Sequence, residues 1–145
     1  MAVHKLDSKV YFGQKALIEK SGKILVLRDP MSRVDGQTGV DFPGGKYRWG
    51  GSLAEELKRE VKEETNLEVD IGLPFFVWTN NNIKYKIEAN HLVRVGYICF
   101  YKRGKVKLSD EHDKFEWVDS KTYKNWEDST GDFKALETYF RLKGS

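Results

Sequence analysis

Four glutamates lie close together in one short segment of the chain, with a spacing that suits metal chemistry. At 100° per residue they fall within one arc of about 100° on a helix. They are Glu56, Glu60, Glu63 and Glu64. Like charges at this spacing repel one another, whereas Mg²⁺ prefers carboxylate oxygens and leaves positions open for phosphate oxygens. The cluster therefore predicts a cation site. A solvated helix face with ion pairs to Arg59 is the alternative.

A glycine-rich approach to this segment favours the cation site. Pro43, Gly44 and Gly45 precede the glutamates by a short distance. Glycines let the backbone come close to a metal or a phosphate, and they expose unhindered carbonyl and amide groups. A tight loop without a binding role is the alternative.

The stretch of residues 45–67 reads GKYRWGGSLAEELKREVKEETNL and resembles the signature of the Nudix hydrolases. That signature is a glycine, five residues, a glutamate, seven residues and then Arg-Glu-aliphatic-x-Glu-Glu-x-Gly-aliphatic. The matching positions are Gly45, Arg59, Glu60, Val61, Glu63, Glu64 and Leu67. Gly51 stands where the family has its first glutamate, which supports the loop and helix electrostatically. Asn66 replaces a glycine, a mild change because asparagine tolerates a left-handed backbone.

The resemblance implies both a fold and an activity. The fold is α+β, an α/β/α sandwich around a mixed curved β-sheet. The activity is Mg²⁺-dependent hydrolysis of the diphosphate linkage in a nucleoside diphosphate derivative, such as a nucleotide sugar, ADP-ribose, a dinucleoside polyphosphate or a nucleoside triphosphate. Mn²⁺ is the expected substitute for Mg²⁺. A small nucleotide is the expected partner, and a homodimer is expected by analogy.

Residue roles follow from the resemblance position by position. The implied ligands of Mg²⁺ are the Gly45 carbonyl, Glu60, Glu63 and Glu64. Glu63 or Glu64 is also the implied acceptor of the proton from water, and Arg59 is the implied residue that orients the carboxylates.

A charged loop later in the chain supplies one more candidate. Many family members add a carboxylate from such a loop, and here Asp110, Glu111, His112 and Asp113 precede the strand that contains Trp117. We select Glu111 as a further metal ligand or general base, and a charged turn is the alternative. His112 is expected to be a surface turn histidine rather than a ligand.

Substrate contacts are expected from residues that flank the glycine loop. Arg28, Lys46 and Arg48 can bind phosphates. Tyr47, Phe75 and Trp78 can stack on a base, with core packing as the alternative.

The elements that must position these residues follow from patterning. Residues 10–18 and 24–28 predict a hairpin, and residues 40–42 predict a short strand. A capping box at Ser52 begins a helix over residues 53–65, which ends at Asn66. Its expected core stripe is Leu53, Ala54, Leu57 and Val61.

Further strands are predicted over residues 67–71, 75–79, 83–87, 92–101 and 114–118, of which 92–101 is expected to be central. Asp132 is expected to cap a final helix whose apolar face contains Phe133, Leu136, Tyr139 and Phe140.

Composition narrows the class of protein. The chain has 145 residues, which predicts a single domain over residues 1–145. Its 25 basic and 22 acidic residues give a net charge of +3, which argues against a protein that wraps nucleic acid. The longest apolar run, residues 95–101, is too short to span a bilayer, and the N-terminus has no secretory signal pattern. The expected location is the cytoplasm.

Two other functions fit the same motifs. A nucleotide-binding module that has lost catalysis is favoured by Gly51. An isomerase of allylic diphosphates would need a catalytic thiol, whereas the single cysteine, Cys99, lies in an apolar strand and is expected to be a buried small hydrophobe.

Overall fold

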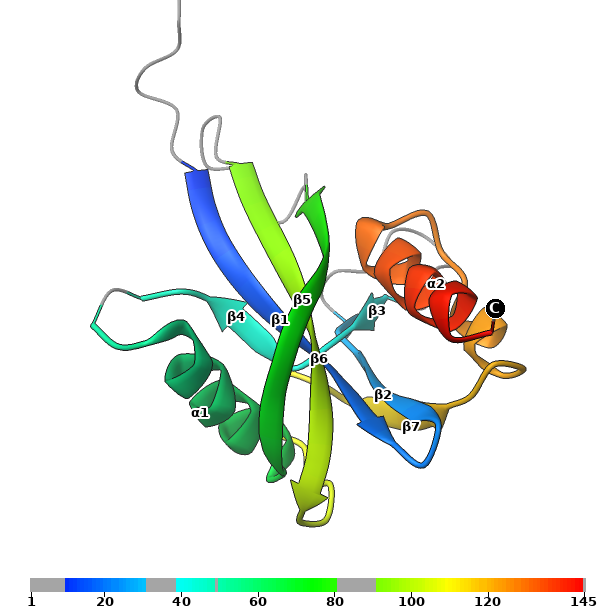
Figure 1. The fold of residues 1–145 in the computed structure, drawn as a ribbon, viewed down its shortest axis with the longest axis horizontal. Coiled ribbons are helices and arrows are strands. Elements are labelled where there is room, and N and C mark those ends of the chain that lie inside the picture. Colours follow the sequence, from blue (N-terminus) through cyan, green and yellow to red (C-terminus); the bar gives the residue numbers. More distant parts are fainter. Residues whose placement is uncertain (1–9, 31–38, 49, 81–90, 145) are drawn as a thin grey trace, which may run out of the picture.

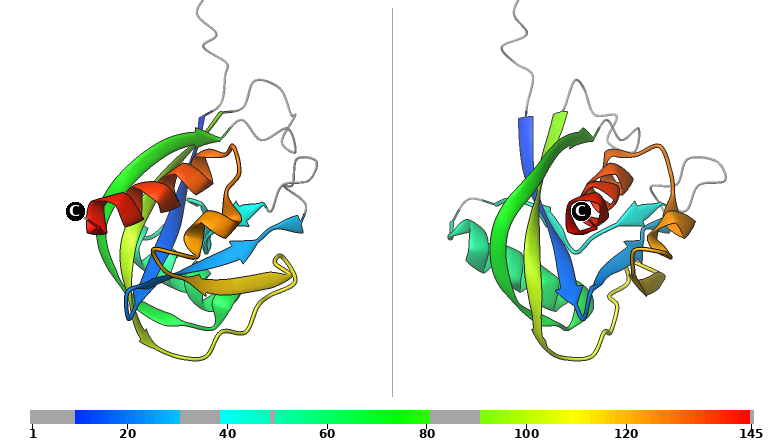
Figure 2. Two further views of the ribbon diagram at one scale, coloured as in Figure 1. Left: turned by 90° about the vertical axis from the view of Figure 1, so that its right-hand side faces the viewer. Right: turned by 45° about the vertical axis from the view of Figure 1, so that its right-hand side comes forward.

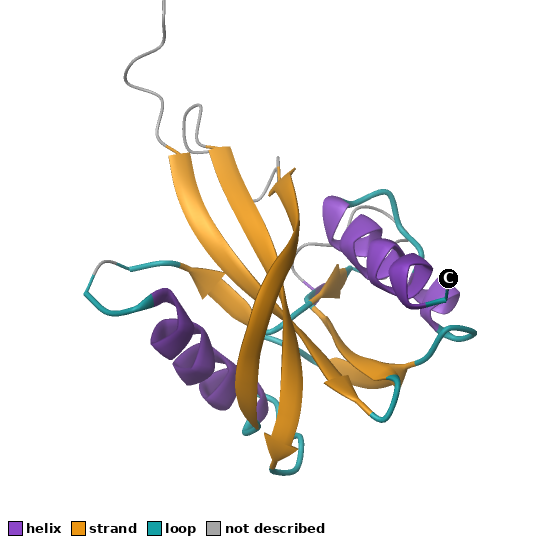
Figure 3. Cartoon of the chain, viewed as in Figure 1, coloured by secondary structure: helices purple, strands orange, loops and turns teal. Residues whose placement is uncertain are grey.

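The computed structural model describes residues 10–30, 39–48, 50–80 and 91–144 of the chain. Within them, seven strands form one mixed sheet that lies between two helices (Figures 1 and 3). The strands are β1 (Val10–Lys20), β2 (Lys23–Arg28), β3 (Val40–Asp41), β4 (Gly44–Lys46), β5 (Glu68–Asn80), β6 (His91–Arg103) and β7 (Lys114–Val118). The helices are α1 (Leu53–Thr65) and α2 (Gly131–Lys143), and a short 3-10 helix, η3 (Tyr123–Trp126), precedes α2.

The sheet is built around the parallel pairing of β1 and β6. Its main order is β3-β2-β1-β6-β5, with β4 added to β1 and β7 added to β2. Figure 2 shows that β5 and β6 curve strongly. The expected central position of the strand over residues 92–101 is confirmed, because β6 lies between β1 and β5.

Alternating side chains of β1 and β2 supply two separate cores. Ala16 and Ile18 pack with α1 residues such as Leu57, whereas Leu17 packs on the other face with α2 residues such as Leu136. Strands that are buried on both faces read as continuous apolar runs, which explains the ALI and ILVL sequences. The predicted α+β sandwich is confirmed.

Several predicted boundaries change in the structure. The hairpin turn shrinks to Ser21 and Gly22, both with positive φ, so the strands extend to Lys20 and start again at Lys23. The two strands expected over residues 67–71 and 75–79 form one strand, β5, with register shifts around Pro74. The strand expected over residues 83–87 lies outside the described residues.

Helix α1 has the predicted limits, but its buried face differs from the prediction. The Ser52 side chain accepts a hydrogen bond from the Glu55 amide, and Asn66 ends the helix with φ of 67°. Leu57 and Val61 are buried, whereas Leu53 is 42% exposed and Ala54 is also exposed. The buried face is shifted because α1 packs against β4 as well as β5 and β1, which turns Glu56 and Glu64 inward.

The predicted cap of α2 is wrong by two residues. Thr130 is the N-cap, and its side chain accepts a hydrogen bond from the Phe133 amide. Asp132 lies in the first turn instead, where Arg94 and the Trp78 indole draw its carboxylate toward the sheet. Neither α1 nor α2 has the length and hydropathy that a membrane crossing requires.

Gly44 is where the fold least tolerates a side chain. Its φ is +132°, and a Cβ there would lie 2.0 Å from the Gln14 carbonyl oxygen. Gly22 also has positive φ, but a Cβ there would meet nothing within 4 Å. We expect Gly44→Ala to cost about 3 kcal/mol or more of unfolding free energy, because it combines a backbone clash with strain, and Gly22→Ala about 1 kcal/mol. Urea denaturation measures both, and equal costs would contradict the close approach of β4 to β1.

Candidate active site

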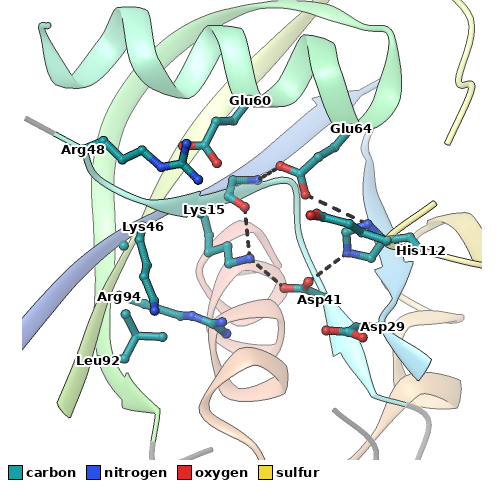
Figure 4. A pocket seen from close by; sticks show the side chains of 14 residues that line it. Lys15, Asp29, Asp41, Lys46, Arg48, Glu60, Glu64, Leu92, Arg94 and His112 are labelled. Carbon is teal, nitrogen blue, oxygen red and sulfur yellow. Dashed lines mark hydrogen bonds and ion pairs between the residues drawn. The ribbon is translucent and has the colours of Figure 1, made fainter. Parts of the chain in front are cut away.

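A pocket of about 410 Å³ opens where β1, β4, β6, α1 and the loop before β7 meet (Figure 4). Most of the residues that line it are charged. They are Gly13, Lys15, Asp29, Asp41, Gly44, Gly45, Lys46, Arg48, Glu60, Glu64, Leu92, Arg94, Glu111 and His112. The structure therefore brings together the predicted residues Gly45, Lys46, Arg48, Glu60, Glu64 and Glu111.

Glu60 and Glu64 enter the pocket from consecutive turns of α1 (Figure 4). Glu64 Oε2 accepts a 2.9 Å hydrogen bond from the Gly44 amide, and its side chain is 10% exposed. A Cβ added to Gly45 would lie 2.4 Å from Glu60 Oε2, so a side chain there would displace that carboxylate from its present position.

Burial sets the charge state of these two carboxylates. Desolvation raises the pKa of Glu64 to about 7, and this outweighs the opposing effects of Lys15 and the Gly44 amide. Desolvation also raises the pKa of Glu60, against the attraction of Arg59. Two partly dehydrated carboxylates beside an unhindered glycine form a donor set that suits a hard divalent cation.

The structure does not bring Glu63 to the pocket. Its side chain is 61% exposed, and Oε1 lies 2.9 Å from Arg59 Nη1. Residue 63 shares the acidic arc of residues 60 and 64, so the difference lies in its side chain, which turns toward Arg59. Glu63 therefore lies outside the pocket lining in this structure, and its role as a metal ligand stays a prediction, as does the positioning role of Arg59.

Glu56 makes the link between loop and helix that Gly51 cannot make. Its Oε2 accepts a 3.0 Å hydrogen bond from the Arg48 amide, and its Oε1 lies 3.2 Å from Arg59 Nη2. The Gly51 carbonyl accepts a hydrogen bond from the Tyr47 hydroxyl instead. The Glu56 carboxylate of α1 thus holds the segment that follows β4.

Lys15 holds the glycine loop from the side of β1. Its ammonium donates to the Phe42 carbonyl at 3.1 Å and to the Gly44 carbonyl at 3.4 Å, and lies 3.0 Å from Asp41 Oδ1. Burial opposes ionisation of Asp41, but Lys15 and His112 together hold its pKa well below the usual range. The sequence prediction missed this pair, although a lysine within the apolar run of β1 is an unusual feature.

His112 is buried, so the expectation of a surface turn histidine is wrong. It is 6% exposed, and Nε2 lies 2.9 Å from Asp41 Oδ2. Burial lowers the pKa of His112, but Asp41 and Glu64 raise it by more. The adjacent Glu111 is exposed and lines the pocket as predicted. The turn therefore directs one side chain inward and leaves the other at the pocket mouth.

Three predicted substrate contacts are placed elsewhere. Arg28 forms an ion pair with Asp113 at 2.6 Å, and it is not among the described residues that line the pocket. Tyr47 packs edge-on against Phe12, beside the loop. Trp78 is 7% exposed in the core. Trp78 therefore packs in the core, which was the alternative to stacking on a base.

Phe75 packs against Tyr139, also in line with core packing. Arg94 lines the pocket and was missed by the sequence prediction, because a single arginine on β6 carries no motif. It is held by Asp132, with Nη1 2.7 Å from Oδ1.

The loop support given by Glu56 is testable by stability. We expect Glu56→Ala to lower the unfolding free energy by about 1–3 kcal/mol, because the part-buried hydrogen bond from the Arg48 amide and the ion pair with Arg59 are both lost. Glu55→Ala is the matched control, since Glu55 is 75% exposed with a 4.0 Å contact to Lys58, and should cost less than about 0.5 kcal/mol. Similar urea midpoints for the two variants would contradict the role of Glu56.

The raised pKa of Glu64 predicts a pH dependence of stability in metal-free protein. Because this pKa is higher in the folded than in the unfolded chain, the stabilisation is complete below the ordinary value of 4.5 and is lost as the pH rises through about 7. We expect the wild type to lose up to about 3 kcal/mol relative to Glu64→Gln over this range. Denaturant titrations with chelator measure the difference, and parallel pH profiles would contradict it.

Comparisons with known proteins identify the family of this chain. The model of the NUDIX domain matches residues 15–139. Among solved structures, the chain is similar to the ORF135 protein of E. coli, with a TM-score of 0.73 and 22% identity over 94% of this chain and 93% of that one. It is similar to a MutT protein from Methanosarcina mazei Go1, with a TM-score of 0.68 and 26% identity over 97% and 99%.

A more distant likeness is to an ADP-ribose pyrophosphatase from Streptococcus suis, with a TM-score of 0.57 and 20% identity over 77% of this chain and 75% of that one. A search of curated proteins finds no match. The domain match covers the glycine loop, α1 and every described residue that lines the pocket except Gly13. The chain therefore belongs to the Nudix hydrolases, a family of pyrophosphohydrolases.

Proposed function

We propose that this protein hydrolyses the diphosphate linkage of a nucleoside diphosphate derivative with the help of Mg²⁺. The observation that carries the proposal is the division of charge within one pocket. Glu60 and Glu64 descend from α1, with Arg48 beside Glu60, while Lys46 and Arg94 lie on another side (Figure 4). A diphosphate bound to a cation needs carboxylates that hold the cation and basic side chains that bind the phosphate oxygens.

The residues proposed to hold Mg²⁺ are Glu60, Glu64, Glu111 and the Gly45 carbonyl. A divalent cation supplies charge neutralisation for phosphate oxygens and activates a water for attack. The protein itself contributes the fixed positions of its donors. The Gly44 amide orients Glu64, and the loop is in turn held by Glu56 and Lys15.

The cationic residues are proposed to bind the phosphates of the substrate. Lys46 and Arg48 lie on or just after β4, and Arg94 reaches the pocket from β6. Their charges oppose those of the substrate and would hold the diphosphate against the α1 carboxylates. The solved structure named as an ADP-ribose pyrophosphatase supports a substrate of this class.

The isomerase alternative lacks its nucleophile. Cys99 is fully buried on β6 and is not among the described residues that line the pocket. Burial raises the pKa of the Cys99 thiol to about 12, so it stays protonated at neutral pH.

A comparison of two adjacent glutamates tests the proposal. Turnover of nucleotide sugars, ADP-ribose, dinucleoside polyphosphates and nucleoside triphosphates should require Mg²⁺. Glu64→Gln should lower kcat by about 100-fold or more, because a ligand in the pocket is lost. Glu63→Gln should lower it by less than about tenfold, because Glu63 is exposed, pairs with Arg59 and does not line the pocket.

The outcomes separate the alternatives. Equal losses in the two variants would contradict the proposed ligand set. Tight nucleotide binding without turnover of any compound in the panel would instead favour a binding module that has lost catalysis.

A further inference from the structure

The imidazole of His112 is held in the way that metal-binding histidines are held. Its side chain is 3% exposed, and Nε2 lies 2.9 Å from Asp41 Oδ2. Asp41 is itself fixed by Lys15, whose Nζ lies 3.0 Å from Oδ1. A carboxylate on one ring nitrogen selects the tautomer and aims the other nitrogen at a metal. In His112 the nitrogen that does not contact Asp41 is Nδ1.

Nδ1 of His112 is buried and has no hydrogen-bond partner among the described residues. The nearest carboxylate atom, Glu64 Oε1, is 3.9 Å away, which is too far for a hydrogen bond. A cation with bonds of about 2.0–2.2 Å to nitrogen and oxygen spans ligand atoms up to about 4.2 Å apart. The 3.9 Å separation of Nδ1 and Glu64 Oε1 is therefore short enough for one cation to bridge the two atoms.

Glu111 completes the group from the pocket mouth. One ligand atom from each of Glu64, Glu111 and His112 lies within 4.8 Å of the other two. Glu111 is exposed, so its side chain has room to turn toward the other two donors. The three donors come from α1 and from the loop before β7. Glu64 and His112 lie on the side of the pocket away from Arg48 (Figure 4).

We propose that His112 Nδ1, Glu64 and Glu111 form a mixed nitrogen and oxygen site that prefers Mn²⁺ over Mg²⁺, next to the carboxylate site at Glu60 and Gly45. Mg²⁺ favours oxygen ligands, whereas an imidazole nitrogen binds transition metals more tightly. The inference rests on the proposed function through Glu64, which the two sites share. It adds a nitrogen ligand, and with it a metal preference, which the glutamates alone do not supply.

Pulsed electron paramagnetic resonance of Mn²⁺ on the substrate-free protein tests the ligand directly. The wild type should show coupling of the electron spin to an imidazole nitrogen, and His112→Gln should lose it. Competition titrations should show Mn²⁺ binding weakened about tenfold or more in His112→Gln, with Mg²⁺ binding nearly unchanged, because glutamine offers oxygen but no imidazole nitrogen. His91→Gln is the matched control, since His91 is another of the three histidines in the chain.

The wild-type spectrum decides the inference even if the variant fails to fold. Absence of nitrogen coupling would overturn it, as would coupling that survives in His112→Gln or disappears in His91→Gln. An unchanged Mn²⁺ affinity in folded His112→Gln would show that His112 only neutralises Glu64, and would overturn it too. Mg²⁺-dependent turnover without nitrogen coupling would leave the proposed function standing, whereas coupling without turnover would contradict that function alone.

Discussion

The buried ammonium of Lys15 is the constraint on which the active site depends. It lies at the centre of β1, and it satisfies the carbonyls of Phe42 and Gly44 while it pairs with Asp41. A buried charge is costly unless it is fully paired, so this one fixes the loop that pairs with it. Asp41 then orients His112, and the Gly44 amide orients Glu64. One cation thereby connects the sheet, the glycine loop and both candidate metal-binding elements.

Helix α1 packs on the sheet and also positions the glycine loop. Leu57 and Val61 pack on the sheet, while Glu56 and Glu64 turn toward the glycine loop. The remaining repulsion within the acidic arc is relieved by Arg59, which lies between Glu56 and Glu63. The glutamates that formed a single group in the sequence therefore divide into a loop support, a surface ion pair and two pocket carboxylates.

Local patterns predicted most of the fold. The limits of α1 followed from Ser52 and Asn66, because caps are set by neighbouring residues. The signature also located Gly45, Glu60 and Glu64, which share one element or its approach. The residues that the signature missed are positioned by contacts between strands that are far apart in the sequence. Lys15 and Asp41 meet only once β3 has paired with β2 and β2 with β1, and His112 contacts Asp41 in the same place.

A crystal structure with Mn²⁺ and a nucleoside diphosphate derivative whose bridging oxygen is replaced by methylene tests the account most directly. Anomalous scattering locates the cation without assumptions about its ligands. The account predicts cation density bonded to Glu60 and Glu64, with the diphosphate against Lys46 and Arg48. A cation bound at Glu63, or a diphosphate bound outside this pocket, would contradict it.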